Sequence, residues 1–253
     1  NLANRTLMYL GISGDGDSAS IGLGQFANAM RRGVRMAYIV ENNGVYGLTK
    51  GQFSATADRG SKSKKGVVNS DSPVDLVGIA LQLGATYVAR SFSGDKAQLV
   101  PLIKGAMAHG GAAFIDVISP CVTFNNHGGS TKSYDYVRQH NEAAGRIDFI
   151  SPGSEITANY PPGSVVDVEQ HDGSVLRLRK LHTDYDPTDR YAAMSYMQSH
   201  AAMGEVVTGL LYIDPLATDL HTSLNTCAVP LNTMNAAQLN PGIKALDKIN
   251  AAL

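Results

Sequence analysis

The sequence has only two cysteines and almost no net charge, and each of these absences narrows the classes of protein that it can encode. Cys121 and Cys227 are the only cysteines among 253 residues, so we expect no disulfide framework, and neither lies in a Cys-x-x-Cys metal pair. The formal net charge of -1 gives no general attraction for nucleic acid or for an anionic membrane surface. We therefore expect neither nucleic acid nor a membrane as a partner.

Long apolar runs are also lacking. No segment approaches the roughly 20 uninterrupted apolar residues of a membrane span, and no charged start followed by an apolar core marks a signal peptide. A cytoplasmic location is the resulting expectation. Because 43% of the residues are hydrophobic and 17% charged, the chain has the composition of a globular protein with a sizeable core. It opens at Asn1 in what reads as a helix-to-strand connection, so we expect an N-terminal piece to be absent.

Strand-type apolar runs alternate with segments of helical spacing along the first half of the chain. This alternation predicts βαβ crossovers and an α/β fold in which helices flank a parallel sheet. Strands are expected at residues 7–12, 34–40, 85–89 and 112–118, and helices at residues 18–32, 74–83 and 95–109. The apolar runs at residues 7–12 and 112–118 are of the type found in buried strands.

We divide the chain into residues 1–150, which form this α/β domain, and residues 151–253, a C-terminal extension that completes the subunit. In the extension, Asp172-Gly173 between two apolar stretches predicts a hairpin. A helix, a strand and an arm that packs on the surface or on a partner are expected to follow, at residues 188–203, 206–213 and 214–253.

The most informative segment is Gly14-Asp15-Gly16-Asp17, which joins the first expected strand to the first helix. Glycines let the backbone approach a ligand closely, and a helix start attracts phosphate. Asp15 would repel a diphosphate unless a divalent cation lay between them, and Mg²⁺ favours carboxylates, neutral oxygens and phosphates as ligands. Asn42-Asn43-Gly44 ends the next strand and supplies such neutral oxygens. The sequence therefore predicts a magnesium-held diphosphate site at the carboxyl ends of adjacent strands.

Two other interpretations of this segment remain open. The residues from Gly14 to Ala19 also satisfy the dinucleotide pattern G-x-G-x-x-A, in which Glu41 would hold a ribose. That pattern is weak on its own, and it leaves Asn42-Asn43 without a role. In the second interpretation, Asp15 only caps a helix in a structural turn.

Three motifs, Gly14 to Asp17, residues 42–52 and residues 119–125, together resemble the beta subunit of 2-oxoacid:ferredoxin oxidoreductases. These enzymes belong to the thiamine diphosphate-binding superfamily, and the chain is most similar to the 2-oxoglutarate type. The resemblance implies the diphosphate-binding domain of that fold. It also implies oxidative decarboxylation of a 2-oxoacid with coenzyme A to acyl-CoA, CO₂ and reduced ferredoxin.

The resemblance further implies roles for individual residues. Asp15, Asn43 and the backbone carbonyl of Val45 would hold Mg²⁺. The residues placed around the cofactor would be Gly14, Asp15, Gly16, Asp17, Asn43, Val45, Gly47, Leu48 and Thr49. Lys50 would act as the catalytic residue that pairs with a substrate carboxylate, whereas the alternative is a solvated loop lysine.

Cys121 follows an expected strand, where a lone cysteine is more often a buried small hydrophobe. The resemblance instead makes it one of four thiolates on a 4Fe–4S cluster, with the other three in an N-terminal region that this sequence lacks. Cys227 is taken as structural. The family's catalytic glutamate lies on the alpha subunit, so the active site is expected at the interface of a heterodimer.

A basic group in the loop after the second strand has two interpretations. It is a mobile solvated loop, or it receives coenzyme A phosphates or the acidic face of a partner such as ferredoxin. Its members are Arg59, Lys62, Lys64 and Lys65. A non-catalytic assembly subunit is the remaining alternative for the whole chain.

Overall fold

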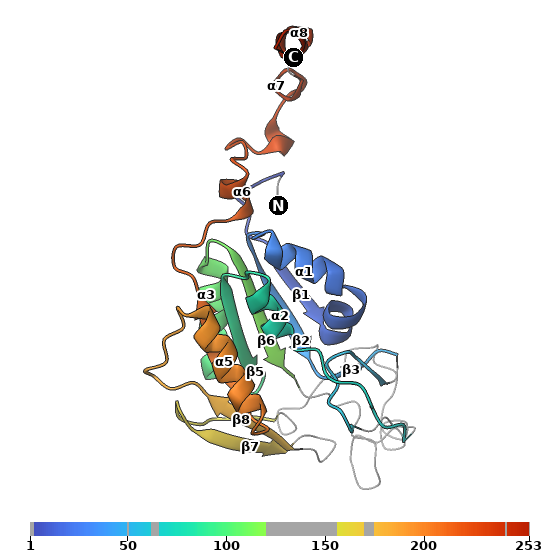
Figure 1. Ribbon diagram of the computed structural model, residues 1–253, viewed down its shortest axis with the longest axis vertical. Coiled ribbons are helices and arrows are strands. Elements are labelled where there is room, and N and C mark those ends of the chain that lie inside the picture. The colour runs from blue at the N-terminus through green and yellow to red at the C-terminus, as the bar shows by residue number, and fades with distance from the viewer. Residues whose placement is uncertain are drawn as a thin grey trace, which may run out of the picture.

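The computed structural model describes residues 3–49, 51–61, 66–119, 156–169, 175–240 and 242–252. Its centre is a seven-stranded sheet in the order β1-β2-β6-β5-β9-β8-β7 (Figure 1). Four of the six neighbouring strand pairs are parallel. The strands are β1 Leu10–Gly14, β2 Met36–Asn42, β5 Tyr87–Phe92, β6 Ala112–Ile118, β7 Val165–Glu169, β8 Val175–Lys180 and β9 Val206–Ile213.

The predicted α/β class is confirmed, but the sheet is mixed rather than wholly parallel. β9 pairs with β5 in the antiparallel sense, and β7 pairs with β8 in the same sense. The chain enters β8 from the predicted hairpin, and the helix α5, Arg190–Ala201, then returns it to β9 parallel to β8. Both strands therefore run opposite to β5, because a helical crossover keeps strand direction.

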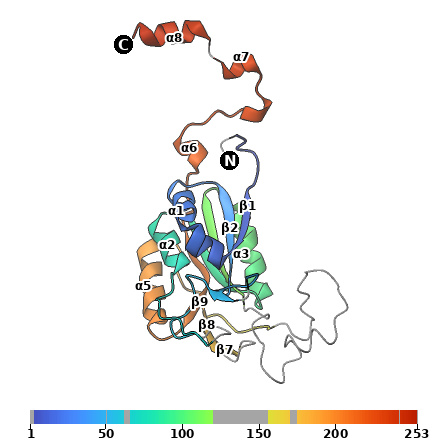
Figure 2. The same ribbon diagram turned by 90° about the vertical axis from the view of Figure 1, so that its right-hand side faces the viewer.

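Helices cover both faces of the sheet (Figures 1 and 2). Three of them, α1 Leu23–Arg31, α2 Leu76–Gln82 and α5, pack on one face around Phe26 and Phe114. The other face is covered by α3, Lys96–Ala108, through Leu102 and Ala106. Asp95 caps α3 by accepting a hydrogen bond from the backbone N–H of Gln98, as its position in the sequence predicts.

Two expectations about the first strand and helix need correction. The helix expected over residues 18–32 is divided: a π-helix, η1, spans Gly16–Ile21, and α1 begins only after Gly22. The apolar run before it is not fully buried, since the side chains of Leu10 and Ile12 are 50% and 62% exposed. β1 lies at the edge of the sheet, and an apolar pattern does not distinguish an edge strand from a central one.

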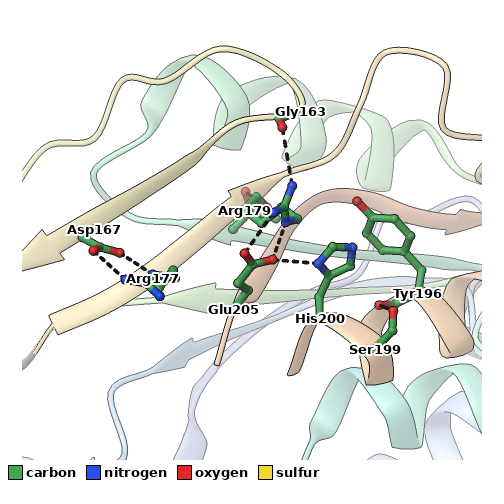
Figure 3. Close-up of polar contacts among 9 residues, drawn as sticks. Gly163, Asp167, Arg177, Arg179, Tyr196, Ser199, His200 and Glu205 are labelled. Carbon is green, nitrogen blue, oxygen red and sulfur yellow. Dashed lines mark hydrogen bonds and ion pairs between the residues drawn. The ribbon is translucent and has the colours of Figure 1, made fainter. Parts of the chain in front are cut away.

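Ion pairs hold the C-terminal strands together (Figure 3). Arg177 on β8 pairs with Asp167 on β7, and Arg179 pairs with Glu205, which also contacts His200 at the end of α5. These contacts cross-link the hairpin, α5 and the start of β9. The proposed division near residue 150 lies outside the described residues.

Beyond β9 the chain forms an arm that extends away from the sheet (Figures 1 and 2). It carries α6 Leu220–Ser223, a 3-10 turn η4 Leu231–Thr233, α7 Ala236–Leu239 and α8 Ile243–Asn250. The arm packs on the domain only at its start: Leu220 and His221 of α6 are buried, and the N–H of Leu220 donates to the carbonyl of Gly33, whereas α8 has no buried residue. Cys227 in this arm is a free, exposed thiol. In the described ranges, no helix combines the length and the apolar character that a membrane crossing needs.

Candidate functional site

The two polar motifs meet where β1 and β2 end side by side. Gly14 lies opposite Glu41 in the parallel register, so Asp15 and Asn43 both follow at the carboxyl ends of these two strands. The side chain of Asp15 is only 1% exposed. The backbone N–H of Asn43 donates to its Oδ1 at 3.4 Å, and that of Gly44 donates to its Oδ2 at 3.1 Å. The predicted convergence of these motifs is thus present in the structure.

Asp15 does not cap the helix that follows it. It occupies the position before η1, but its side chain makes no capping hydrogen bond there. Its carboxylate instead accepts hydrogen bonds from residues in the loop that follows β2. The interpretation of Asp15 as a structural helix cap is therefore wrong.

Two hydroxyl groups complete the surroundings of Asp15. Ser54 and Thr56 both donate to Oδ2, the same oxygen that accepts from Gly44. Among the described residues, Oδ2 thus has three donors, whereas Oδ1 has only the long contact from Asn43. Because Oδ2 is saturated, Oδ1 is the carboxylate oxygen that can bind a cation.

The donor set fits a hard divalent cation. In the described ranges no lysine, arginine or histidine forms an ion pair with Asp15, and a buried carboxylate without a counter-charge is costly. The neighbouring oxygens are neutral: the side-chain oxygen of Asn43 accepts from the backbone N–H of Val45 at 3.0 Å. A single carboxylate with amide and carbonyl oxygens is a set that Mg²⁺ accepts. Groups of three or more His, Cys, Asp or Glu side chains suited to a metal do not occur in these parts of the chain.

Gly16 is fixed by its packing against Tyr46. A Cβ atom there would lie 2.4 Å from the tyrosine ring, and the Tyr46 hydroxyl donates to the carbonyl of Gly16 at 3.0 Å. Around Gly14, by contrast, an added Cβ would meet nothing within 4 Å. The turn therefore leaves open space at Gly14, where a ligand can approach the backbone, and is closed at Gly16.

The loop after β2 is more regular than its composition indicates. It contains a two-stranded antiparallel hairpin, β3 Val45–Tyr46 and β4 Gln52–Phe53. Gly47, Leu48 and Thr49 form the connecting turn, where the side chain of Leu48 is 99% exposed. Their predicted contact with the cofactor stays a prediction.

Several predicted residues lie outside the described part of the chain. They are Lys50, the lysines of the basic loop at positions 62, 64 and 65, and Cys121. Arg59 is described and exposed.

A buried charged network lies next to the Asn43–Gly44 turn. Asp116 of β6 is fully buried and accepts from the side-chain amide of Asn42 at 3.1 Å and from Nε of Arg90 at 2.7 Å. Arg90 also donates to Asp75 at 2.8 Å. Burial opposes the charge of Arg90, but the two carboxylates outweigh it and raise its pKa. Burial raises the pKa of Asp116, against the effects of Arg90 and Asn42.

This network binds the side-chain nitrogen of Asn42 to Asp116. Sequence reasoning missed Ser54 and Thr56, which are small hydroxyl residues in a polar loop without any diagnostic spacing. It also missed Asp116, although a signal was present: a single carboxylate inside the apolar run of a buried strand needs a buried partner.

The N-terminal part of the chain, which contains this site, is similar to a family of thiamine diphosphate enzymes. The family model described as "Thiamine pyrophosphate enzyme, C-terminal TPP binding domain" matches residues 2–117. This range includes β1, β2 and both polar motifs. The dinucleotide interpretation of the glycine turn is accordingly disfavoured.

Curated relatives define the class more narrowly. The chain is 46% identical to the 2-oxoacid:ferredoxin oxidoreductase subunit beta of Saccharolobus solfataricus, over 49% of this chain and 41% of the relative. It is 34% identical to the 2-oxoglutarate synthase subunit KorB of Methanocaldococcus jannaschii, over 67% of this chain and 64% of the relative. The chain thus spans less than two thirds of these relatives.

A solved structure agrees with this assignment. The 2-oxoglutarate:ferredoxin oxidoreductase from Magnetococcus marinus, with 2-oxoglutarate, coenzyme A and succinyl-CoA bound, matches 92% of this chain and 65% of its own with a TM-score of 0.60 and 27% identity. The resemblance predicted from the three motifs is confirmed. The chain is a homologue of the beta subunits of 2-oxoacid:ferredoxin oxidoreductases.

Proposed function

We propose that the chain provides the thiamine diphosphate side of the active site in a cytoplasmic 2-oxoacid:ferredoxin oxidoreductase, with 2-oxoglutarate as the 2-oxoacid. The observation that carries this proposal is the buried Asp15 carboxylate, which faces the Asn43–Gly44 turn and whose Oδ1 accepts only the 3.4 Å contact from Asn43 among the described residues. The homology of the chain to beta subunits of these enzymes supports it.

In this proposal the chain's own residues hold and orient the cofactor. Asp15, Asn43 and the carbonyl of Val45 bind Mg²⁺, which neutralises the diphosphate, and Gly14 leaves room for the phosphates to approach the backbone. Bound thiamine diphosphate supplies the nucleophilic carbon that decarboxylates 2-oxoacids. Lys50 pairs with the substrate carboxylate.

The complete enzyme requires partners that the chain does not contain. We propose that Cys121 contributes one thiolate to a 4Fe–4S cluster, which passes electrons to ferredoxin. An alpha subunit completes the active site, and coenzyme A accepts the acyl group. Production of acyl-CoA separates this assignment from a non-catalytic assembly subunit.

Calorimetric titration with thiamine diphosphate, in Mg²⁺ and in a chelator, tests the proposal. The wild-type protein should bind the cofactor only with metal, and Asp15→Ala should abolish metal-dependent binding. Asp184→Ala is the matched control, because that carboxylate is exposed in the loop before α5. Circular dichroism checks that both variants are folded. Metal-dependent binding that survived in folded Asp15→Ala would overturn the assignment of the motif.

A further inference from the structure

The buried charged network of Asp116, Arg90 and Asn42 has a geometry that points to a functional role. Asp116 lies opposite Val40 on β2 and opposite Arg90 on β5 in the parallel register. Asn42 comes two residues after Val40, so its side chain points to the same face of the sheet. The fully buried carboxylate of Asp116 on β6 therefore links Asn42, the last residue of β2, to Arg90 on β5.

Asn42 is held by two separate contacts at this point. Its side-chain amide donates to Asp116, and its backbone carbonyl accepts from the N–H of Ser119 at 2.8 Å. The next two residues, Asn43 and Gly44, direct their backbone N–H groups at Asp15. A rotation of the Asn42 peptide would therefore change the distance between the Asn43–Gly44 turn and the carboxylate of Asp15.

A buried carboxylate is a costly way to join two strands. Apolar side chains in the same positions are often equally stabilising, so a retained charge calls for another explanation. Asp116 is satisfied only when Arg90 and Asn42 both donate to it. The bond to Asn42 thus selects one conformation of the β2 end, which packing of apolar groups would not do.

We infer that Asp116 is a positioning residue that, with Arg90, holds Asn42 and thereby sets the Asn43–Gly44 turn for cation binding. This inference depends on the proposed function of the same site. It predicts that loss of the hydrogen bond between Asn42 and Asp116 weakens Mg²⁺ affinity even where the protein stays folded. Changes to groups that orient metal ligands typically cost roughly 10–100-fold in metal affinity, and we expect about tenfold here.

The test measures the Mg²⁺ dependence of thiamine diphosphate binding in the full-length protein, with any subunit that co-purifies. Asp116→Asn should raise the Mg²⁺ dissociation constant about tenfold, and excess Mg²⁺ should restore cofactor affinity. Asn42→Ala should have the same effect, and it tests the inference independently if Asp116→Asn fails to fold. The side chain of Asn42 is only partly buried.

Asp75→Asn is the matched control from the same network. Asp75 contacts Arg90 but not Asn42 in the contacts that the structure gives, and its side chain is 50% exposed. Asparagine retains the helix cap that Asp75 provides to α2. This variant should therefore keep the wild-type Mg²⁺ affinity, whereas a general structural effect would weaken it as well.

The outcomes separate the two proposals. Wild-type protein without Mg²⁺-dependent binding would contradict the proposed function. Normal wild-type binding with unchanged Mg²⁺ affinity in folded Asn42→Ala would overturn the role of the network alone. Equal weakening in Asp75→Asn would do the same, since it would indicate a structural effect.

Discussion

The hydroxyl of Thr56 offers a sensitive test of how the site presents Asp15. Thr56 and Ser54 both donate to Oδ2, beside the backbone N–H of Gly44. These three donors fix the carboxylate so that Oδ1 faces away from them. Thr56→Val removes one donor and keeps the shape of the side chain. The carboxylate then gains freedom to rotate, and Oδ1 is less often placed to bind the cation.

The expected magnitude follows from the hydrogen bond that is lost. A hydrogen bond to a charged group contributes about 1.5–3 kcal/mol. If most of this serves to orient Asp15, Mg²⁺ affinity should fall roughly 10–100-fold, which equals about 1.4–2.8 kcal/mol. We therefore expect the dissociation constant of Mg²⁺ to rise at least tenfold, with thiamine diphosphate affinity recovering at high Mg²⁺. Isothermal titration at several Mg²⁺ concentrations measures both quantities.

Thr188→Val is the matched control, because the hydroxyl of Thr188 donates to Asp186 at 2.7 Å in an exposed loop. The carbonyl of the preceding residue, Pro187, accepts a hydrogen bond from the backbone N–H of Ile213. Ile213 lies opposite the first residue of β5. Thr188 is thus at the end of the sheet remote from the site. An unchanged Mg²⁺ dissociation constant in folded Thr56→Val would refute the argument that Oδ2 donors orient Asp15.

Two further predictions concern stability. Arg179 donates to Glu205 and, together with His200, lowers the pKa of Glu205 to about 2 from an ordinary value near 4.5. The stabilisation of the folded state by the ionised Glu205 is therefore complete above pH 4.5 and is lost as the pH falls toward 2. Urea unfolding at pH 7 and pH 3 should show a smaller loss in Glu205→Gln than in wild type, and equal losses would contradict this. Lys180 pairs with Asp95 at a buried position, so Asp95→Ala or Lys180→Met should each cost about 3–5 kcal/mol of unfolding free energy. The double variant should cost less than the sum, and additive losses in urea unfolding would disprove the coupling.

The sequence predicts the parts of this fold that depend on apolar periodicity. The strand over residues 112–118 has the expected bounds, because six consecutive residues there are buried between two helical layers. Strand direction carries no such signal, which is why the antiparallel pairing of β9 was missed. Exposure of Ile12 was missed for a related reason, since strand order decides which apolar run lies at an edge.

For the site, the sequence predicts which motifs meet but not what holds them. Asp15 and Asn43 follow neighbouring parallel strands, so their proximity is a consequence of topology. Ser54 and Thr56 reach Asp15 only because the β3–β4 hairpin turns the loop back over it. Contacts of this kind depend on loop conformation, which has no periodic pattern in the sequence.

The arrangement also implies that cation binding and loop closure are coupled. Asp15 is held from the loop side by Ser54 and Thr56, while Asn42 is anchored from the sheet side by Asp116. Only the first set belongs to the loop after β2. In the proposed site, a cation on Oδ1 would stabilise the ionised carboxylate, which keeps the hydroxyl donors in place, so metal affinity and loop order would rise together by the same coupling free energy.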